Sequence, residues 1–308
     1  MPLFRRCDGE LVKTETPVRT ILPYVMRGRN ESAIYHEESY DITKTRTWLR
    51  DFNRARPERL PAGLFHLFIW ACAQGLHKRP ELNRFVSGAR LYRRKGVFIS
   101  FAAKKAFKDD APLVTIKLDF PPVEPFAACV DRINAAIMEG RGPRSSTVDK
   151  ELALAMALPG WLLSGLMRLL RWLDTLNLKP RFMIEGDPLY TSMFAANLGS
   201  VGLDRTYHHL YEEGTASLFA VLGSPRRETT FDRKNQPVSR DILEARWTLD
   251  ERVADGFYCA ASLKIARRIM EDPVAHIGIP AAAAGVPETG ALPTSSATTA
   301  AAPPTPQL

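Results

Sequence analysis

The chain has 308 residues, of which 45% are hydrophobic and 25% charged, and these fractions exclude collagen-like, coiled-coil and wholly disordered proteins. Lysine and arginine outnumber aspartate and glutamate by 42 to 34, and the net charge of +8 favours anionic partners such as a phosphorylated ligand, nucleic acid or an acidic membrane. The four cysteines form no CxxC pair, so we expect reduced thiols rather than a disulfide framework or a zinc ribbon.

The first half of the chain alternates predicted strands and helices. Strands are predicted over residues 31–41, 91–92, 97–103 and 114–120. Helices are predicted over residues 42–53, 63–77 and 125–139. Thr43 is the expected N-cap of the first helix, and the second is apolar on nearly every side and should be buried. A turn at Lys95 and Gly96 predicts a hairpin between the second and third strands.

An apolar segment, residues 152–173, is long enough to cross a membrane. Pro159 and Gly160 interrupt it, and Arg168 and Arg171 lie within it. A spanning helix would place both guanidinium groups in the bilayer, at a cost of about 3 kcal/mol each. We therefore predict one or two amphipathic helices that pack on the domain or, as the alternative, contact a membrane surface.

Residues 1–20 are charged throughout and lack a continuous apolar core, so they do not read as a signal peptide. We expect a cytoplasmic protein, with a peripheral position on the inner face of a membrane as the alternative. The sequence shows no GxGxxG and no GxxxxGK[ST] motif, so neither of these phosphate-binding loops is predicted.

The second half of the chain continues the mixed pattern. Strands are predicted over residues 190–196, 217–222 and 244–249, and an amphipathic helix over 255–271. From Ile277 onward the chain consists mainly of Ala, Pro, Thr, Ser and Gly, which is typical of a disordered tail. The predicted organisation is an N-terminal extension (1–16), one domain (17–276) with an apolar helical insert at about 150–178, and the tail (277–308).

Three segments, in this order, resemble the catalytic domains of dihydrolipoamide acyltransferases from 2-oxoacid dehydrogenase complexes, which are relatives of chloramphenicol acetyltransferase. Residues 79–102 (RPELNRFVSGARLYRRKGVFISFA) resemble the family's Pro-Glu-Leu-Asn block. Residues 194–199 (FAANLG) resemble its strand ending in Ser-Asn-Leu-Gly, and 250–256 (DERVADG) resemble its signature Asp-His-Arg-x-x-Asp-Gly. Residues 18–30 resemble its first helix, so the likeness covers most of 17–275.

The resemblance implies an α/β (α+β) fold of the chloramphenicol acetyltransferase type, a mixed sheet flanked by helices. It also implies a homotrimer whose active sites lie in channels between neighbouring subunits. Acyl-coenzyme A would enter from one end as a cosubstrate, and no covalently bound cofactor is expected. We expect no metal site, because no third ligand accompanies His208 and His209, and no nucleic-acid partner, because the positive charge is dispersed.

The chain departs from the family at both positions that carry its chemistry. Glu251 stands where the family has the histidine that acts as general base. Ala196 stands where a serine or threonine donates a hydrogen bond to the oxyanion, an interaction worth about 3–4 kcal/mol in comparable enzymes. Asp255 matches the family's aspartate, which pairs with an arginine, and Arg19 is the expected partner, with Arg27 and Arg29 as alternatives.

Other residues are candidates to supply the missing chemistry. Burial would raise the pKa of Glu251 and make it a usable base. His208 or His209 would form a histidine–carboxylate couple with Glu251, although a hydrogen-bonded loop pair is the alternative for these histidines. The family's channel lining corresponds to a set of four residues: Asn197, Gly199, Ser200 and Tyr211. Ser192 is a poor substitute for the missing hydroxyl, because it lies roughly 13 Å from Ala196 at strand rise.

The resulting functional hypothesis is a stand-alone acyltransferase that moves an acyl group from acyl-coenzyme A or another thioester to an acceptor at a rewired site. The alternative is a catalytically inactive trimeric scaffold or ligand-binding relative, a pseudoenzyme. Loss of both the histidine and the hydroxyl favours the alternative, whereas retention of Asp255 and of an ionisable group at Glu251 favours the enzyme.

Overall fold

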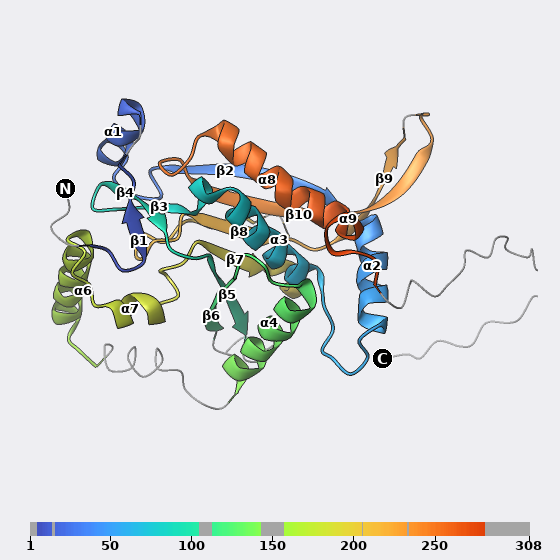
Figure 1. Cartoon of the computed structure of the whole chain (residues 1–308), viewed down its shortest axis with the longest axis horizontal. Helices are drawn as coiled ribbons and strands as arrows, with labels where there is room; N and C mark the ends of the chain where they lie inside the picture. Colours follow the sequence, from blue (N-terminus) through green and yellow to red (C-terminus); the bar gives the residue numbers. More distant parts are fainter. Residues whose placement is uncertain are drawn as a thin grey trace, which may run out of the picture.

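A seven-stranded mixed sheet forms the centre of the protein (Figure 1). The computed structural model describes residues 5–13, 16–104, 113–142, 157–204, 206–232 and 234–280. The strands follow the order β2 (Ala33–Asp41), β10 (Pro237–Asp250), β8 (Leu218–Leu222), β7 (Met193–Asn197), β5 (Phe98–Lys104) and β6 (Leu113–Asp119). Strand β7 runs parallel to β5 and β8, and the other pairs are antiparallel. In Figure 1, β9 (Arg226–Phe231) and the first half of β10 form a hairpin that extends beyond the sheet.

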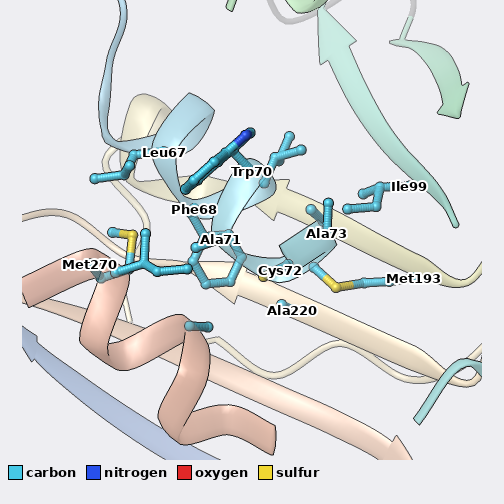
Figure 2. Packing of buried hydrophobic residues seen from close by; sticks show 14 of the residues in the cluster. Leu67, Phe68, Trp70, Ala71, Cys72, Ala73, Ile99, Met193, Ala220 and Met270 are labelled. Carbon is cyan, nitrogen blue, oxygen red and sulfur yellow. The ribbon is translucent and has the colours of Figure 1, made fainter. Parts of the chain in front are cut away.

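Helices cover one face of this sheet. They are α2 (Thr43–Arg54), α3 (Leu64–Lys78), α4 (Phe126–Arg141) and α8 (Gly256–Glu271), followed by the short α9 (Pro273–Ile277). Helix α3 lies in the middle, with Leu67, Phe68, Ile69 and Ala71 fully buried. Figure 2 shows its residues between Met270 of α8 and the sheet. Burial of each large side chain, such as Leu67, Phe68 or Ile69, contributes about 1.5–3 kcal/mol, so the apolar residues around α3 hold the helix in the core.

A second, three-stranded antiparallel sheet lies at one end of the molecule. Its order is β1 (Gly9–Leu11), β4 (Arg90–Arg94) and β3 (Arg84–Ser87), so the predicted N-terminal extension contributes one strand. Near it lie α1 (Pro17–Val25), α6 (Gly160–Thr175) and α7 (Arg181–Gly186) (Figure 1). Two 3-10 turns, η1 (Pro80–Asn83) and η2 (Leu198–Val201), complete the described elements.

The predicted mixed sheet with flanking helices is confirmed, but two local predictions are wrong. Thr43 is not the N-cap of α2: the helix already begins there, and the carboxylate of Asp41 accepts from its main-chain N–H and hydroxyl. The segments around Lys95 and Gly96 do not form a hairpin, because β4 belongs to the small sheet and β5 to the large one. The hairpin joins β3 to β4 instead, through Gly88 and Ala89, both with positive φ as a two-residue turn requires.

The apolar insert is described from residue 157 onward, and the predicted tail lies outside the described residues beyond 280. Helix α6 exposes an apolar face made of five residues: Trp161, Leu162, Leu166, Leu169 and Trp172. Its last turn packs on the domain, because Asp174 pairs with Arg6 and accepts from Ser87. In the described part of the chain, no helix is long and apolar enough to cross a membrane.

All four cysteines are free thiols. Cys72, Cys129 and Cys259 are buried and Cys7 is half-buried. Burial raises the pKa of Cys129 to about 12 and that of Cys259 to about 11, so neither is a ready source of thiolate at neutral pH. Cys129 and Cys259 are therefore packing residues rather than nucleophiles.

Lys117 on β6 predicts a pH dependence of stability. Its ammonium group donates to the carbonyls of Ile184, Glu185 and Asp187, and burial lowers its pKa from 10.5 to about 8. Between these pH values the unfolded chain binds more protons than the folded chain, so the cost of burying charged Lys117 is relieved as pH rises. Urea unfolding of the wild type minus Lys117→Met should show stability gained between pH 8 and 10.5, and a flat difference would contradict this.

Candidate active site

A buried ion pair fixes the loop that follows β10. Asp250 is fully buried, and its carboxylate accepts from Arg252 Nε at 2.9 Å, Arg252 Nη2 at 2.7 Å and Ser32 Oγ at 3.0 Å. Arg252 Nη1 also donates to the main-chain carbonyls of Met26 and Arg27, both at 3.0 Å. This arginine therefore ties the end of β10 to the segment after α1, and it determines where Glu251 stands.

Glu251 itself faces solvent. Its main-chain N–H donates to the Ser32 carbonyl at 2.9 Å, and its side chain is exposed. Among the described residues, its carboxylate has no hydrogen bond or ion pair. A single chain therefore supplies neither the buried surroundings nor the histidine neighbour that we expected for this carboxylate.

The aspartate matched to the family pairs with the expected arginine. Arg19 Nη2 lies 3.5 Å from Asp255 Oδ2, while Asp255 Oδ1 accepts from the Tyr258 N–H and caps α8. Of the two alternatives, Arg29 donates to main-chain carbonyls, and the guanidinium of Arg27 has no partner in the described part of the chain. We call Glu251, Asp250, Arg252, Asp255 and Arg19 the glutamate corner.

His208 and His209 belong to an aromatic stack on the face of the sheet opposite the helices. The His208 ring lies 3.9 Å from that of Phe219 at an angle of 9°, and the His209 ring lies 4.6 Å from that of His208. Tyr211 packs against both histidines at 5.5–5.6 Å between ring centres. Thr248 on β10 donates to the His208 carbonyl and holds the segment in place. We call His208, His209, Tyr211 and Phe219 the histidine cluster.

The hydrogen bonds of these histidines define their tautomers. Nδ1 of His208 lies 2.7 Å from the His209 carbonyl oxygen, and Nδ1 of His209 lies 2.9 Å from the Leu210 carbonyl oxygen. A carbonyl oxygen only accepts, so each Nδ1 carries a proton, and in the neutral form of each ring Nε2 presents the lone pair. Burial lowers the pKa of His208, which keeps that ring neutral near pH 7. The His208 ring is therefore arranged as a base rather than as an acid.

Ala196 packs beside the histidine cluster, against Phe194 and Phe219. No hydroxyl replaces the missing donor there. Ser200 Oγ donates to the Asn197 carbonyl at 2.7 Å, and the buried Ser192 Oγ accepts from the Phe98 N–H at 3.0 Å. The side-chain amide of Asn197 is half-buried and has no partner among the described residues.

Gly199 follows at a point of close approach. A Cβ at this position would lie 2.3 Å from the Gly223 carbonyl oxygen, so no other residue fits the turn after β7. The same residue accepts a hydrogen bond from Ser224 through its carbonyl. This packing fixes the end of β7, and with it the position of Asn197.

Within one chain, Glu251 lies far from Ala196 along the sheet, and its carboxylate contacts no histidine among the described residues. Ala196 pairs with Val221 across β7 and β8, and Val221 pairs with Arg246 across β8 and β10. Glu251 lies five residues beyond Arg246, a separation of about 17 Å at the usual strand rise. One chain therefore separates Glu251 from Ala196 along the sheet. The histidine cluster lies between these two positions, because His208 stacks on Phe219 and its carbonyl accepts from Thr248, three residues before Glu251.

The Asp250–Arg252 pair and the role of Arg29 were not singled out from the sequence as site residues. The signal available was the Asp-x-Arg spacing in residues 250–252, which places two opposite charges on the same side of an extended segment. Among the described residues, no group of three His, Cys, Asp or Glu side chains could hold a metal ion.

No protein-family model and no curated protein sequence matches the chain. Solved structures do. A probable dihydrolipoamide acetyltransferase from Listeria monocytogenes has a TM-score of 0.56 and 14% identity over 85% of this chain and 94% of its own. The dihydrolipoamide acetyltransferase of Azotobacter vinelandii has a TM-score of 0.57 and 16% identity, covering 86% and 93%. A chloramphenicol acetyltransferase has a TM-score of 0.54 and 10% identity, covering 85% and 100%.

These identities are low, so the likeness concerns the fold. The Azotobacter structure was determined to study the role of a serine, a histidine and an asparagine in the catalytic mechanism of that enzyme. The chain therefore has the acyltransferase fold that dihydrolipoamide acetyltransferase cores share with chloramphenicol acetyltransferase.

Proposed function

We propose that the protein is an acyltransferase that acts as a homotrimer, with each active site formed by the glutamate corner of one copy and the histidine cluster of the next. The observation that carries this proposal is the separation of Glu251 from Ala196 along the sheet of one chain, together with a Glu251 carboxylate that contacts no histidine among the described residues. A site that joins Glu251 to the position of Ala196 and Asn197 is complete only when a second copy supplies one of the two. The exposed, unpartnered carboxylate of Glu251 is suited to such a contact.

The proposed chemistry is general base catalysis by one of the two histidines. Nε2 of His208 or His209 takes the proton from an acceptor thiol or hydroxyl, which attacks the thioester carbonyl. The carboxylate of Glu251 from the neighbouring copy stabilises the imidazolium that forms. The tetrahedral oxyanion then collapses, the carbon–sulfur bond breaks, and the coenzyme A thiolate takes the proton from the imidazolium. The Asn197 amide is the proposed donor to the oxyanion in place of the missing hydroxyl.

Thiol release from acyl-coenzyme A thioesters of increasing chain length tests this proposal. With dihydrolipoamide as one acceptor, we expect turnover by the wild type and a fall of about 100-fold or more in Glu251→Gln and in the His208→Ala/His209→Ala double variant. His276→Ala is the matched control, since His276 is an exposed histidine of α9 and its loss should leave turnover unchanged. Turnover that survives both site variants would contradict the proposed site.

The second candidate function is a catalytically inactive trimeric scaffold or ligand-binding relative. It is favoured by the methyl group of Ala196 and by the engagement of Ser192 and Ser200 in main-chain hydrogen bonds. In that case no thioester is turned over. Measurable coenzyme A binding without turnover would indicate a ligand-binding protein, and absence of binding would indicate a scaffold. A cytoplasmic location and contact of residues 152–173 with a membrane surface stay predictions.

A further inference from the structure

A polar cavity of about 190 Å³ lies between the end of α1, the β3–β4 turn, the last turns of α6 and the segment 212–214. Glu251 and the histidine cluster do not line it, so it is distinct from the proposed reaction centre, although Arg252 of the glutamate corner forms part of its wall. Helix α6 closes it through Arg171, Asp174 and Thr175. The turn at Gly88 presses against α6, since a Cβ there would lie 2.7 Å from the Thr175 carbonyl oxygen. The cavity is thus built by the apolar insert docking on the domain.

Most charges that line this cavity are already paired. Asp174 is held by Arg6 Nη2 at 3.0 Å, and Glu213 is held by Arg171 Nε at 2.7 Å. Arg252 belongs to the ion pair with Asp250 behind the wall. These three pairs contribute no net charge, so the net charge of the cavity depends on the remaining side chains.

Two of the remaining side chains are guanidinium groups. Arg29 is only 7% exposed, yet its partners are main-chain carbonyls, including those of Glu212 and Gly214, both at 2.6 Å. Within the described residues no carboxylate forms an ion pair with it, and its Nε is buried without a partner. Burial lowers the pKa of Arg29 despite the acidic groups nearby. Arg27 is exposed and its guanidinium is unpartnered in the described part of the chain.

The remaining carboxylate is Glu212, and its hydrogen-bonding capacity is largely used. It accepts from the N–H groups of Arg29 at 3.0 Å and Asn30 at 2.9 Å, and from Asn30 Nδ2 at 2.8 Å. The lining side chains together carry four positive and three negative formal charges. The cavity therefore keeps one positive charge, an unsatisfied buried donor and a free guanidinium at its mouth.

We propose that this cavity binds an oxyanion of the phosphate type, held by Arg29 from the floor and by Arg27 and Arg171 from the rim. Planar guanidinium groups present paired N–H donors that match the geometry of phosphate oxygens. The anion is either free phosphate or a phosphate group of a larger ligand such as a nucleotide thioester, because both present the same chemistry. The proposal does not rest on acyl transfer.

Calorimetric titration with inorganic phosphate, with chloride added to hold ionic strength constant, tests the proposal on the full chain. Arg27→Gln should weaken phosphate binding about tenfold, because it removes one charged donor. Glu213→Gln should strengthen it severalfold, because it releases Arg171 and removes a negative charge from the rim. Arg168→Gln is the control, since this exposed arginine lies on α6 and does not line the cavity.

Arg27→Gln and Glu213→Gln are expected to change the phosphate affinity in opposite directions. Together with the Arg168→Gln control, they distinguish a binding site from general attraction by surface charge. If phosphate does not bind, or if Arg27→Gln and Arg168→Gln weaken binding equally, the proposal is overturned. Glu213→Gln that weakens binding would overturn it as well. Titration with coenzyme A then identifies the source: an equal loss in Arg27→Gln assigns the cavity to a phosphate of the larger ligand, and a loss for inorganic phosphate alone assigns it to the free anion.

Discussion

Gly214→Ala should strongly destabilise the folded chain. Gly214 has a φ of +79°, and a Cβ there would lie 2.2 Å from the Leu189 carbonyl oxygen and 2.5 Å from its carbon. At the same place the Thr215 N–H donates to the Leu189 carbonyl at 2.9 Å. This hydrogen bond holds the two backbone segments together, so neither can move away to make room for a Cβ. Left-handed strain and overpacking together predict a loss of roughly 3–5 kcal/mol in the free energy of unfolding.

Urea unfolding measures this loss, and Gly165→Ala is the matched control. Gly165 lies inside α6, and a Cβ there meets nothing within 4 Å. Alanine should stabilise this helix by about 0.5–1 kcal/mol, because it reduces the conformational entropy of the unfolded chain. A Gly214→Ala protein whose stability lies within 1 kcal/mol of the wild type would show that the 189 and 214 segments do not meet as described.

Arg252→Met should destabilise the folded chain by about 3–5 kcal/mol, because it leaves the fully buried carboxylate of Asp250 without its cation. It also removes the two hydrogen bonds that hold the segment after α1. The loop that positions Glu251 should then lose its fixed geometry, so any thioester turnover should fall together with stability.

Two further variants distinguish the free-energy cost of an unpaired buried charge from that of a lost contact. Arg19→Met breaks an ion pair whose aspartate is 63% exposed, and it should cost at most about 1 kcal/mol. Asp250→Asn combined with Arg252→Met leaves no buried charge and should recover part of the loss. Urea unfolding gives the free energies of unfolding of the wild type and the three variants. Equal losses for Arg252→Met and Arg19→Met would contradict the proposed role of the Asp250–Arg252 pair.

Local patterns predicted the helices and several strands well. The apolar periphery of α3 and the clean alternation of β6 are properties of neighbouring residues, and the structure has both elements where the sequence placed them. Strand pairing was harder. The turn at Lys95 and Gly96 looks like a hairpin locally, but whether β4 pairs with β5 or with β1 and β3 depends on residues far away in sequence.

For the candidate site, the sequence indicated which residues take part better than how they are arranged. The pairing of Arg19 with Asp255 was expected from the resemblance, and the two groups lie 3.5 Å apart. The expected meeting of Glu251 with His208 or His209 does not occur in one chain, because the Glu251 side chain is exposed while the histidine rings stack with Phe219 and with each other, and no short-range pattern encodes these orientations. The tautomers of the histidines also depend on carbonyl groups whose directions only the folded backbone sets.

The central claim is that each active site uses two copies of the chain, and mixed trimers test it most directly. Chains carrying Glu251→Gln are coexpressed with chains carrying His208→Ala and His209→Ala, each variant being inactive alone. With random assembly, about one quarter of the interfaces join an intact glutamate corner to an intact histidine cluster, so thioester turnover should recover to about a quarter of the wild-type rate. Mixed trimers no more active than either variant alone, beside an active wild type, would contradict the claim.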